Sequence, residues 1–255
     1  MSRGMLMLVI ACGGVAFGQV DGTTPGWFEF DMPGLAAAPG TVADMSAMNP
    51  EPAGKHGFVR IENGHFVDGR SRRLRLFGTN VTGDSCFPEP DESRRLAIRL
   101  RQLGFNCLRL HFMDFSWGGE TRESVWANSD TGKLDEAESM RKLDRLVAEC
   151  TANGIYINLN LHVGREYPGT PTIPGDRSFR FGKSVDRWYP PFIAMQEAYA
   201  RAMLDRENTV TGVRWADDPA ICCIELNNEN TMIRDERRVY RKLEEPFAGT
   251  FASLW

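Results

Sequence analysis

Residues Asp218 to Asn230 read D-P-A-I-C-C-I-E-L-N-N-E-N, and the rest of the chain is best interpreted from this stretch outward. An apolar, β-prone run ends abruptly in a cluster of amides around the carboxylate of Glu229. Burying such polar groups without partners costs about 1–3 kcal/mol each. We therefore expect the cluster at the open carboxyl end of a buried parallel strand, where such folds build their functional sites. A strand followed by an asparagine-rich turn is the simpler alternative.

Two further stretches have a similar form, in which glycine opens an apolar run and histidine closes it. They are Gly104–Phe112, G-F-N-C-L-R-L-H-F, and Gly154–Val163, G-I-Y-I-N-L-N-L-H-V. Each follows an amphipathic stretch, so each glycine stands where the C-terminal cap of a helix is expected. Leu74–Asn80, L-R-L-F-G-T-N, is an earlier run with the same kind of ending.

The pattern predicts four strand–helix units. In order, they are strand 74–79, helix 91–103, strand 105–110, helix 135–153, strand 155–161, helix 190–206, strand 220–226 and a partial helix from about 237. Alternating strands and helices predict a parallel sheet with helices outside it. Right-handed crossovers then place the carboxyl end of every strand on one face. We expect four polar residues to meet there: Asn80, His111, His162 and Glu229.

These pieces, in this order, resemble the clan A glycoside hydrolases, most closely the cellulase-like family 5 group. The matching pieces are F-G-T-N at 77–80, L-G-F-N-C-L-R-L-H at 103–111, G-I-Y-I-N-L-N-L-H at 154–162 and I-E-L-N-N-E at 224–229. Phe58 to Val67, with Glu62-Asn63-Gly64 as its turn, is similar to the hairpin that closes the barrel bottom in that group. The resemblance covers roughly residues 55–235.

The resemblance implies an α/β fold of the (β/α)8 TIM-barrel type, with only about the first four βα units present. In the family, a glutamate at the end of the seventh strand is the nucleophile, and this sequence ends at Leu254-Trp255, before such a strand. We expect a truncated barrel, because a free-standing half-barrel would expose strand edges and an apolar inner face.

Cleavage of a glycosidic bond needs one carboxyl group to protonate the leaving oxygen and a second to attack or to activate water. Glu229 is the candidate acid/base, because a strand end would partly withdraw its carboxyl from water. In the family, the residue matching Asn228 binds the sugar 2-hydroxyl, and the arginine matching Arg109 keeps the nucleophile ionised. An arginine in an apolar strand demands a carboxylate, so a structural Arg109–Glu225 ion pair is the alternative. The two roles can coexist.

The other candidates are predicted to bind sugar. Family residues that match His111 and His162 contact hydroxyls or support the acid/base, although either histidine alone can be a satisfied core residue. Two histidines facing one cavity can also hold a metal, but the sequence offers no third ligand, so we expect neither metal nor cofactor. Asn80 completes the polar set. Aromatic faces stack on sugars, and the predicted rim loops carry the preferred platform Trp117, together with Tyr167, Trp188 and Tyr189.

The N-terminus predicts export. Met1–Gly18 has Arg3, then an apolar core, then the small-residue pattern A-F-G that a signal peptidase reads. We expect a mature start near Gln19 and a secreted or periplasmic protein, not attached to a membrane once the signal is removed; a lipoprotein modified at Cys12 is the alternative. Residues 19–54 are predicted to form an irregular arm, and residues 55–255 the partial barrel.

The net charge of −4 gives no electrostatic reason to expect a nucleic-acid partner. The sequence as a whole predicts a secreted retaining glycoside hydrolase that acts on β-linked polysaccharides or oligosaccharides. It also predicts a fragment without the nucleophile half, and hence an inactive chain. The alternative is a non-catalytic carbohydrate-binding barrel or a decayed one.

Overall fold

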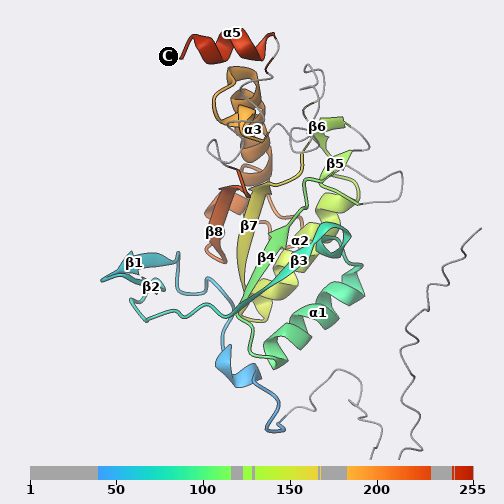
Figure 1. The fold of residues 1–255 in the computed structure, drawn as a ribbon. Helices are drawn as coiled ribbons and strands as arrows, with labels where there is room; N and C mark the ends of the chain where they lie inside the picture. The colour runs from blue at the N-terminus through green and yellow to red at the C-terminus, as the bar shows by residue number, and fades with distance from the viewer. Residues whose placement is uncertain are drawn as a thin grey trace, which may run out of the picture. The chain divides into compact units, whose positions relative to one another are not determined.

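A four-stranded parallel sheet organises the structure (Figure 1). The computed structural model describes residues 40–115, 123–127, 130–165, 167, 183–230, 243 and 245–254. The sheet order is β3-β4-β7-β8, formed by Gly78–Thr82, Cys107–His111, Tyr156–His162 and Ile221–Asn227. Every neighbouring pair is parallel. The carboxyl ends of all four strands therefore lie along one edge, as the alternation of strands and helices predicts.

Three long helices connect these strands. They are α1, Pro90–Gln102, between β3 and β4; α2, Ser139–Ala152, before β7; and α3, Pro190–Leu204, before β8. Two of them, α1 and α3, begin with proline, whose fixed φ suits the first helical turn. Gly104 and Gly154 follow α1 and α2 with φ of 80° and 78°, the left-handed geometry that glycine adopts without strain. Figure 1 shows α1 and α2 packed side by side next to the strands.

The main core lies between the sheet and the helices, because side chains alternate between the two faces of each strand. Residues that face the helices are apolar, while the residues between them in sequence are polar. The apolar strand residues are fully or almost fully buried against α1, α2 and α3. Burial of each such leucine or isoleucine stabilises the fold by about 1.5–3 kcal/mol. They are Leu108, Leu110, Ile157, Leu159 and Leu161.

Two antiparallel hairpins accompany the sheet. The predicted one is present as β1, Arg60–Glu62, and β2, His65–Val67, with φ of 50° and 76° at Asn63 and Gly64 in the turn. A second one, formed by β5, Trp126–Ala127, and β6, Asp130–Leu134, follows β4 and was not expected from the sequence. The remaining elements are the short helices η2 Ser46–Met48, η3 Gly83–Cys86, η5 Val185–Arg187, η6 Trp215–Asp217 and α5 Phe247–Ala252.

The first strand of the sheet begins later than predicted. The apolar alternation at Leu74 and Leu76 suggested strand 74–79, but β3 spans Gly78–Thr82. Leu74 and Leu76 instead pack at the amino ends of the later strands, against Ala53, Tyr156 and Ala220. The apolar alternation at Leu74 and Leu76 therefore reflects their packing and not hydrogen bonding within the parallel sheet. One consequence is that Asn80 lies in the middle of its strand and not at its end.

The described part of the predicted arm runs along the ends of the helices. Met45 donates its N–H to the Gln102 carbonyl at 2.8 Å, and Ala53 donates to the Thr151 carbonyl at 2.9 Å. Backbone contacts divide the chain into Met1–Leu35 and Ala36–Trp255, and every described residue belongs to the second unit. The predicted signal peptide and the start of the partial helix near residue 237 lie outside the described residues.

A buried carboxylate joins α2 to the segment that leads into β8. Asp144 is fully buried and accepts hydrogen bonds from Arg206 Nη1 at 2.5 Å, Thr209 Oγ1 at 2.9 Å and Trp215 Nε1 at 3.2 Å. Since the Arg206 side chain is only 9% exposed, both charges of the pair are largely withdrawn from water. Removal of one partner would leave the other charge buried and uncompensated.

Asp144→Ala should therefore lower the free energy of unfolding by about 3–5 kcal/mol, measured by urea denaturation of the full chain. Asp144→Asn keeps one acceptor oxygen, for either Thr209 or Trp215, and should cost less. The control is Asp205→Ala, because the exposed Asp205–Arg214 pair should contribute about 1 kcal/mol or less. Equal losses for Asp144→Ala and Asp205→Ala would show that the buried pair does not hold these elements together.

Candidate functional site

The inward faces of the strands carry an unusual density of polar side chains. On β4 these are Arg109 and His111, which alternate with the buried leucines. On β7 and β8 the corresponding inward residues are Asn158, Asn160 and Glu225. The register pairs Arg109 with Asn158, and Asn160 with Glu225. This layer of polar residues lies just below the carboxyl ends of the strands, so it forms the floor of the candidate site.

Arg109, on β4, lies at the centre of this floor and contacts side chains from the other three strands and from Asn228, just after β8. Its Nε and Nη2 donate to the two carboxylate oxygens of Glu225, each at 2.6 Å. Nη1 donates to Asn80 Oδ1 at 3.3 Å, and Nη2 also lies 3.0 Å from Asn160 Oδ1 and 3.1 Å from Asn228 Oδ1. The guanidinium fork is therefore held in one orientation by its neighbours.

Both members of this ion pair are held in their charged forms. The hydrogen bond from Arg109 lowers the pKa of Glu225 below its ordinary value; partial burial opposes this, and a second bond from Asn158 Nδ2 at 2.8 Å supports it. The hydrogen bond to Glu225 correspondingly raises the pKa of Arg109. The side chains are about one quarter exposed, 25% for Arg109 and 28% for Glu225. The structure thus contains the ion pair that the sequence suggested as a structural role for Arg109.

The chain turns sharply where β8 ends, and this turn carries Asn228 and Glu229. Asn228 donates its N–H to the His162 carbonyl at 2.9 Å, which extends the ladder one step beyond β8. Glu229 then adopts φ of 47°, in the left-handed region that costs a residue with a side chain about 1–2 kcal/mol. Its side chain is exposed, so the predicted withdrawal from water is absent here. The reason is that β8 is the edge strand, open to solvent on its far side.

His111 and His162 both close their strands, as predicted, but their surroundings differ. His111 is half-buried, and its Nδ1 lies 2.7 Å from Asn160 Oδ1, so it belongs to the floor with Arg109. His162 is only 2% exposed, with Nε2 3.0 Å from Asp186 and Nδ1 3.6 Å from Asp114. A sugar hydroxyl has no access to it, so the predicted substrate contact of His162 is wrong in this structure. His162 contributes to the site indirectly, through its contacts with Asp114 and Asp186.

The two carboxylates favour a protonated His162. Burial alone would lower the pKa of His162, but the nearby Asp114 carboxylate and the hydrogen-bonded carboxylate of Asp186 outweigh burial and raise it above its ordinary value. The Tyr167 hydroxyl lies 3.2 Å from Nε2 and completes the surroundings of the ring. Asp114 is itself fully buried and accepts the N–H groups of Val163, Gly164 and Arg165 at 2.8–3.2 Å. Residues 163–165, which directly follow β7, are thereby fixed.

The predicted aromatic platforms are not found. Tyr167 and Trp188 are each 7% exposed, and both belong to a packed aromatic cluster with Tyr189, Phe192 and Phe247. Tyr167 stacks on Phe192 with ring centroids 4.2 Å apart, and Trp188 packs edge-on against Tyr189. The apolar faces of these rings pack against each other and so are not open to a ligand. The preferred platform, Trp117, lies outside the described residues.

Several residues that build the site were missed in the sequence. Asn158 and Asn160 had a visible signal, the strict alternation I-N-L-N-L-H in β7. Asp114 follows β4 closely, which is a weaker signal. Nothing in the local sequence marks the partners that come from the loop before α3 and from α3 itself. These are Lys183, Asp186 and Gln196.

The described residues contain no group of three or more histidines, cysteines or acidic residues in an arrangement that could hold a metal ion. The same part of the chain contains no helix with the length and apolar character needed to cross a bilayer.

A parallel sheet of βα units whose polar interior ends in an Asn-Glu pair defines the (β/α)8 barrel class of glycoside hydrolases. Residues 67–235 match the family model described as cellulase, glycosyl hydrolase family 5. The chain belongs to this family.

Individual relatives support the assignment. The chain is 30% identical over 189 residues to mannan endo-1,4-beta-mannosidase 3 of Oryza sativa subsp. japonica, covering 67% of this chain and 37% of that protein. A family 5 mannosidase from Rhizomucor miehei superposes with a TM-score of 0.52 at 17% identity, covering 76% of this chain and 58% of that one. An endo-1,4-beta-mannanase from the same organism gives 0.50 at 22% identity, covering 68% and 48%. The structural matches establish the fold alone.

The chain thus spans little more than a third of the rice protein and about half of the two fungal enzymes. The matched part includes the strand that ends in Asn228 and Glu229, since the family model extends to residue 235.

Glu225→Gln should reveal the charge of the ion pair through the pH dependence of stability. A carboxyl whose pKa is lowered by folding stabilises the protein above its unfolded pKa, about 4.3 for glutamate, and this contribution is lost as the pH falls through the folded value. At pH 7 the variant should be less stable by about 1.5–3 kcal/mol, the range for a hydrogen bond to a charged group. Below about pH 4.3 the difference from wild type should shrink.

Urea unfolding between acidic and neutral pH measures this difference. Glu207→Gln, at an exposed glutamate, is the matched control and should stay within about 0.5 kcal/mol of wild type. A Glu225→Gln difference that stays constant with pH would contradict an ionised Glu225 in the folded state.

Proposed function

We propose that this chain provides the acid/base half of a retaining glycoside hydrolase that cleaves β-linked mannans or related β-glucans. One observation carries the proposal: the Asn228-Glu229 turn follows β8 directly, above an arginine of β4 that contacts the other three strands. Family membership supports hydrolysis of glycosidic bonds in general. The retaining mechanism, the substrate and the role of each residue are the parts that need testing.

In the proposed reaction, Glu229 donates its proton to the glycosidic oxygen as the bond to the anomeric carbon breaks. A second carboxylate, on a strand that the described residues do not include, attacks the anomeric carbon and forms a glycosyl-enzyme. Water then releases the sugar, with Glu229 acting as the base. Glu229 serves this role from an exposed turn, so part of its environment would come from the substrate and from the strands that complete the barrel.

Asn228 is suited to read the substrate. Its Oδ1 is engaged by Arg109 Nη2 at 3.1 Å, which turns the amide Nδ2 away from the arginine. An amide donor in a fixed orientation next to the acid can hold the sugar 2-hydroxyl, an interaction that strengthens toward the transition state. Mannose and glucose differ at carbon 2, so this contact is also where the two sugars would be distinguished.

Mannan is the favoured substrate because the rice relative, which is 30% identical over 189 residues, is named for it. We also infer export from the signal-like pattern of Met1–Gly18, since a polymer of this kind must be cut outside the cell. The formal net charge of the chain, −4, agrees with a neutral polysaccharide as the partner.

Glu229→Gln, in the protein with its barrel complete, should abolish cleavage of mannan and of glycosides with poor leaving groups. General acid catalysis contributes about 10²–10⁴-fold to such reactions. Aryl glycosides with activated leaving groups need little protonation, so their glycosylation rate should fall far less. Reducing-end release and the pre-steady-state release of the phenol measure the two effects.

Glu207→Gln is the control, because it makes the same chemical change on an exposed segment outside the site. Equal losses on both types of substrate would argue against an acid role for Glu229. Binding of mannan oligosaccharides without turnover by the completed wild type would instead favour the non-catalytic alternative.

The 255-residue chain assayed alone should bind oligosaccharides weakly and turn over none of them. A retaining mechanism needs two carboxyl groups about 5–5.5 Å apart. Glu225 is a poor substitute for the missing one, because it lies four residues, or about 13 Å, down the same strand and is bound to Arg109. Hydrolysis that disappears in Glu229→Ala would contradict this prediction and would point to a second carboxylate on the rim.

A further inference from the structure

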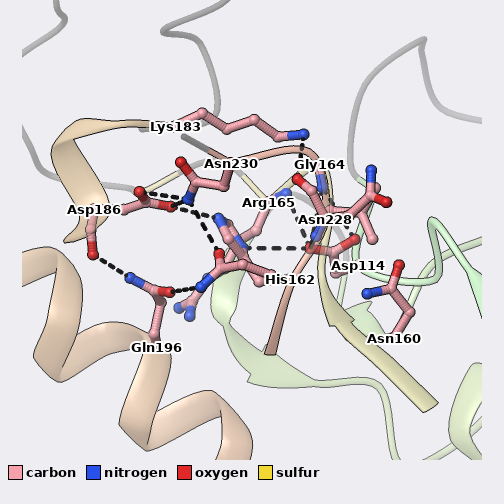
Figure 2. Close-up of polar contacts among 12 residues, drawn as sticks. Asp114, Asn160, His162, Gly164, Arg165, Lys183, Asp186, Gln196, Asn228 and Asn230 are labelled. Atoms are coloured by element: carbon pink, nitrogen blue, oxygen red, sulfur yellow. Dashed lines mark hydrogen bonds and ion pairs between the residues drawn. The ribbon is translucent and has the colours of Figure 1, made fainter. Parts of the chain in front are cut away.

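The segment that carries Glu229 is fastened to a loop far away in the sequence. Lys183 Nζ donates to the Asn228 carbonyl at 2.9 Å, and the Ser184 N–H donates to Asn230 Oδ1 at 2.8 Å. Asn230 Nδ2 in turn donates to both carboxylate oxygens of Asp186, at 2.7 and 2.9 Å. Figure 2 shows the contacts of Lys183 and Asp186, with Lys183 above the turn and Asp186 facing Asn230. The residues on either side of Glu229 are thus held by the loop 183–187.

Asp186 is a buried charge whose surroundings keep it in place. Its side chain has no exposed surface, and His162 Nε2 lies 3.0 Å from Oδ2. Its main-chain oxygen accepts a hydrogen bond from Gln196 Nε2 of α3 at 2.7 Å, while Gln196 Oε1 accepts from Asn227 Nδ2 at 3.2 Å. Asp186 therefore joins the end of β7 to the turn after β8 through its carboxylate, and it contacts the middle of α3 through its main-chain oxygen.

The conformation of the turn explains why the contact between Asp186 and Asn230 matters. Glu229 has φ of 47°, a strained conformation that persists only where the surroundings fix it. Its side chain is exposed, so the direction of the carboxyl depends on the backbone that carries it. Asn228 is fixed by the His162 carbonyl on one side of Glu229, and Asn230 is fixed by Asp186 on the other. Release of either neighbour would let the strained residue relax.

We propose that Asp186 is a positioning residue for Glu229. Through Asn230, it holds the turn after β8 in the conformation that directs the Glu229 carboxyl into the candidate site. The inference rests on the proposed function of Glu229 as the acid/base. Asp186 does not touch the substrate; it acts through the amide of Asn230 and is itself oriented by His162.

The structure supplies variants that separate positioning from general stability. Asp186→Asn keeps an oxygen that can accept from Asn230, whereas Asp186→Ala removes both acceptors. Asn230→Ala removes the same contact from the other side and leaves Asp186 paired with His162. Asp217→Ala is the matched control, because this aspartate pairs with Arg214 on the exposed surface, where its side chain is 60% exposed.

The first measurement uses the 255-residue chain and needs no activity. Backbone ¹H–¹⁵N relaxation should show an ordered turn at 228–230 in wild type and in Asp217→Ala. Asp186→Ala and Asn230→Ala should raise fast motion at 228–230, while the order of β7 and the helical part of α3 is unchanged. Asp186→Asn should keep most of the order. An ordered turn in Asp186→Ala would overturn the proposal, and so would loss of order spread evenly over the whole unit.

The second measurement uses the protein with its barrel complete, at a temperature well below the unfolding transition of each variant. Asp186→Ala should lower kcat on mannan by about tenfold or more, since small misplacements of a catalytic group are costly, with KM little changed. Activated aryl glycosides should lose less than threefold. Equal losses on the two substrates would mark a merely structural role for Asp186 and overturn the proposal. Failure of the proposed function is distinguishable, because Glu229→Gln itself would then show no dependence on the leaving group.

Discussion

The bidentate ion pair between Arg109 and Glu225 is the interaction on which the rest of the structure depends. A guanidinium in the interior of a sheet must have its donors satisfied, because a buried charge without a partner is strongly destabilising. Arg109 meets this demand with acceptors from β3, β7 and β8 at once. A shift of β8 by one residue would place Ile224 or Leu226 where Glu225 stands. The pair therefore selects one register for all four strands, and with it the position of the strand ends.

Elements with strong local signals could be predicted from the sequence, and those without such signals could not. The helices α1 and α2 carry helical periodicity and end at Gly104 and Gly154, so their ends were within a few residues of the prediction. The first strand was misplaced because Leu74 and Leu76 obey the same alternation while packing against Tyr156 and Ala220. The β5–β6 hairpin was missed because its first strand has only two residues, too few to show a period.

The candidate site shows the same division between local and distant signals. Strand-end residues were predictable, because parallel strands bring their carboxyl ends to one edge whatever the details of packing. The role of His162 was not, since Asp114 and Asp186 both come from other parts of the chain and neither stands in a motif. Tyr167 and Trp188 were misjudged for a related reason. An aromatic residue in a loop has the same sequence signature whether it faces a ligand or packs on another ring, and here both pack in the cluster around Phe192.

Glu229 lies between two residues that are fixed by separate sets of contacts. Asn228, before it, is tied to the charged floor through Arg109, and Asn230, after it, is tied to the buried carboxylate of Asp186. The floor is built from strand residues whose pattern is visible in the sequence, whereas the second support comes from a loop and a helix. The presence of an acid at this position is thus a local property of the sequence, but its direction is a property of the fold. An Asn-Glu pair after an apolar strand therefore identifies a candidate, and the strained φ at Glu229, held from both sides, is what distinguishes it from an ordinary asparagine-rich turn.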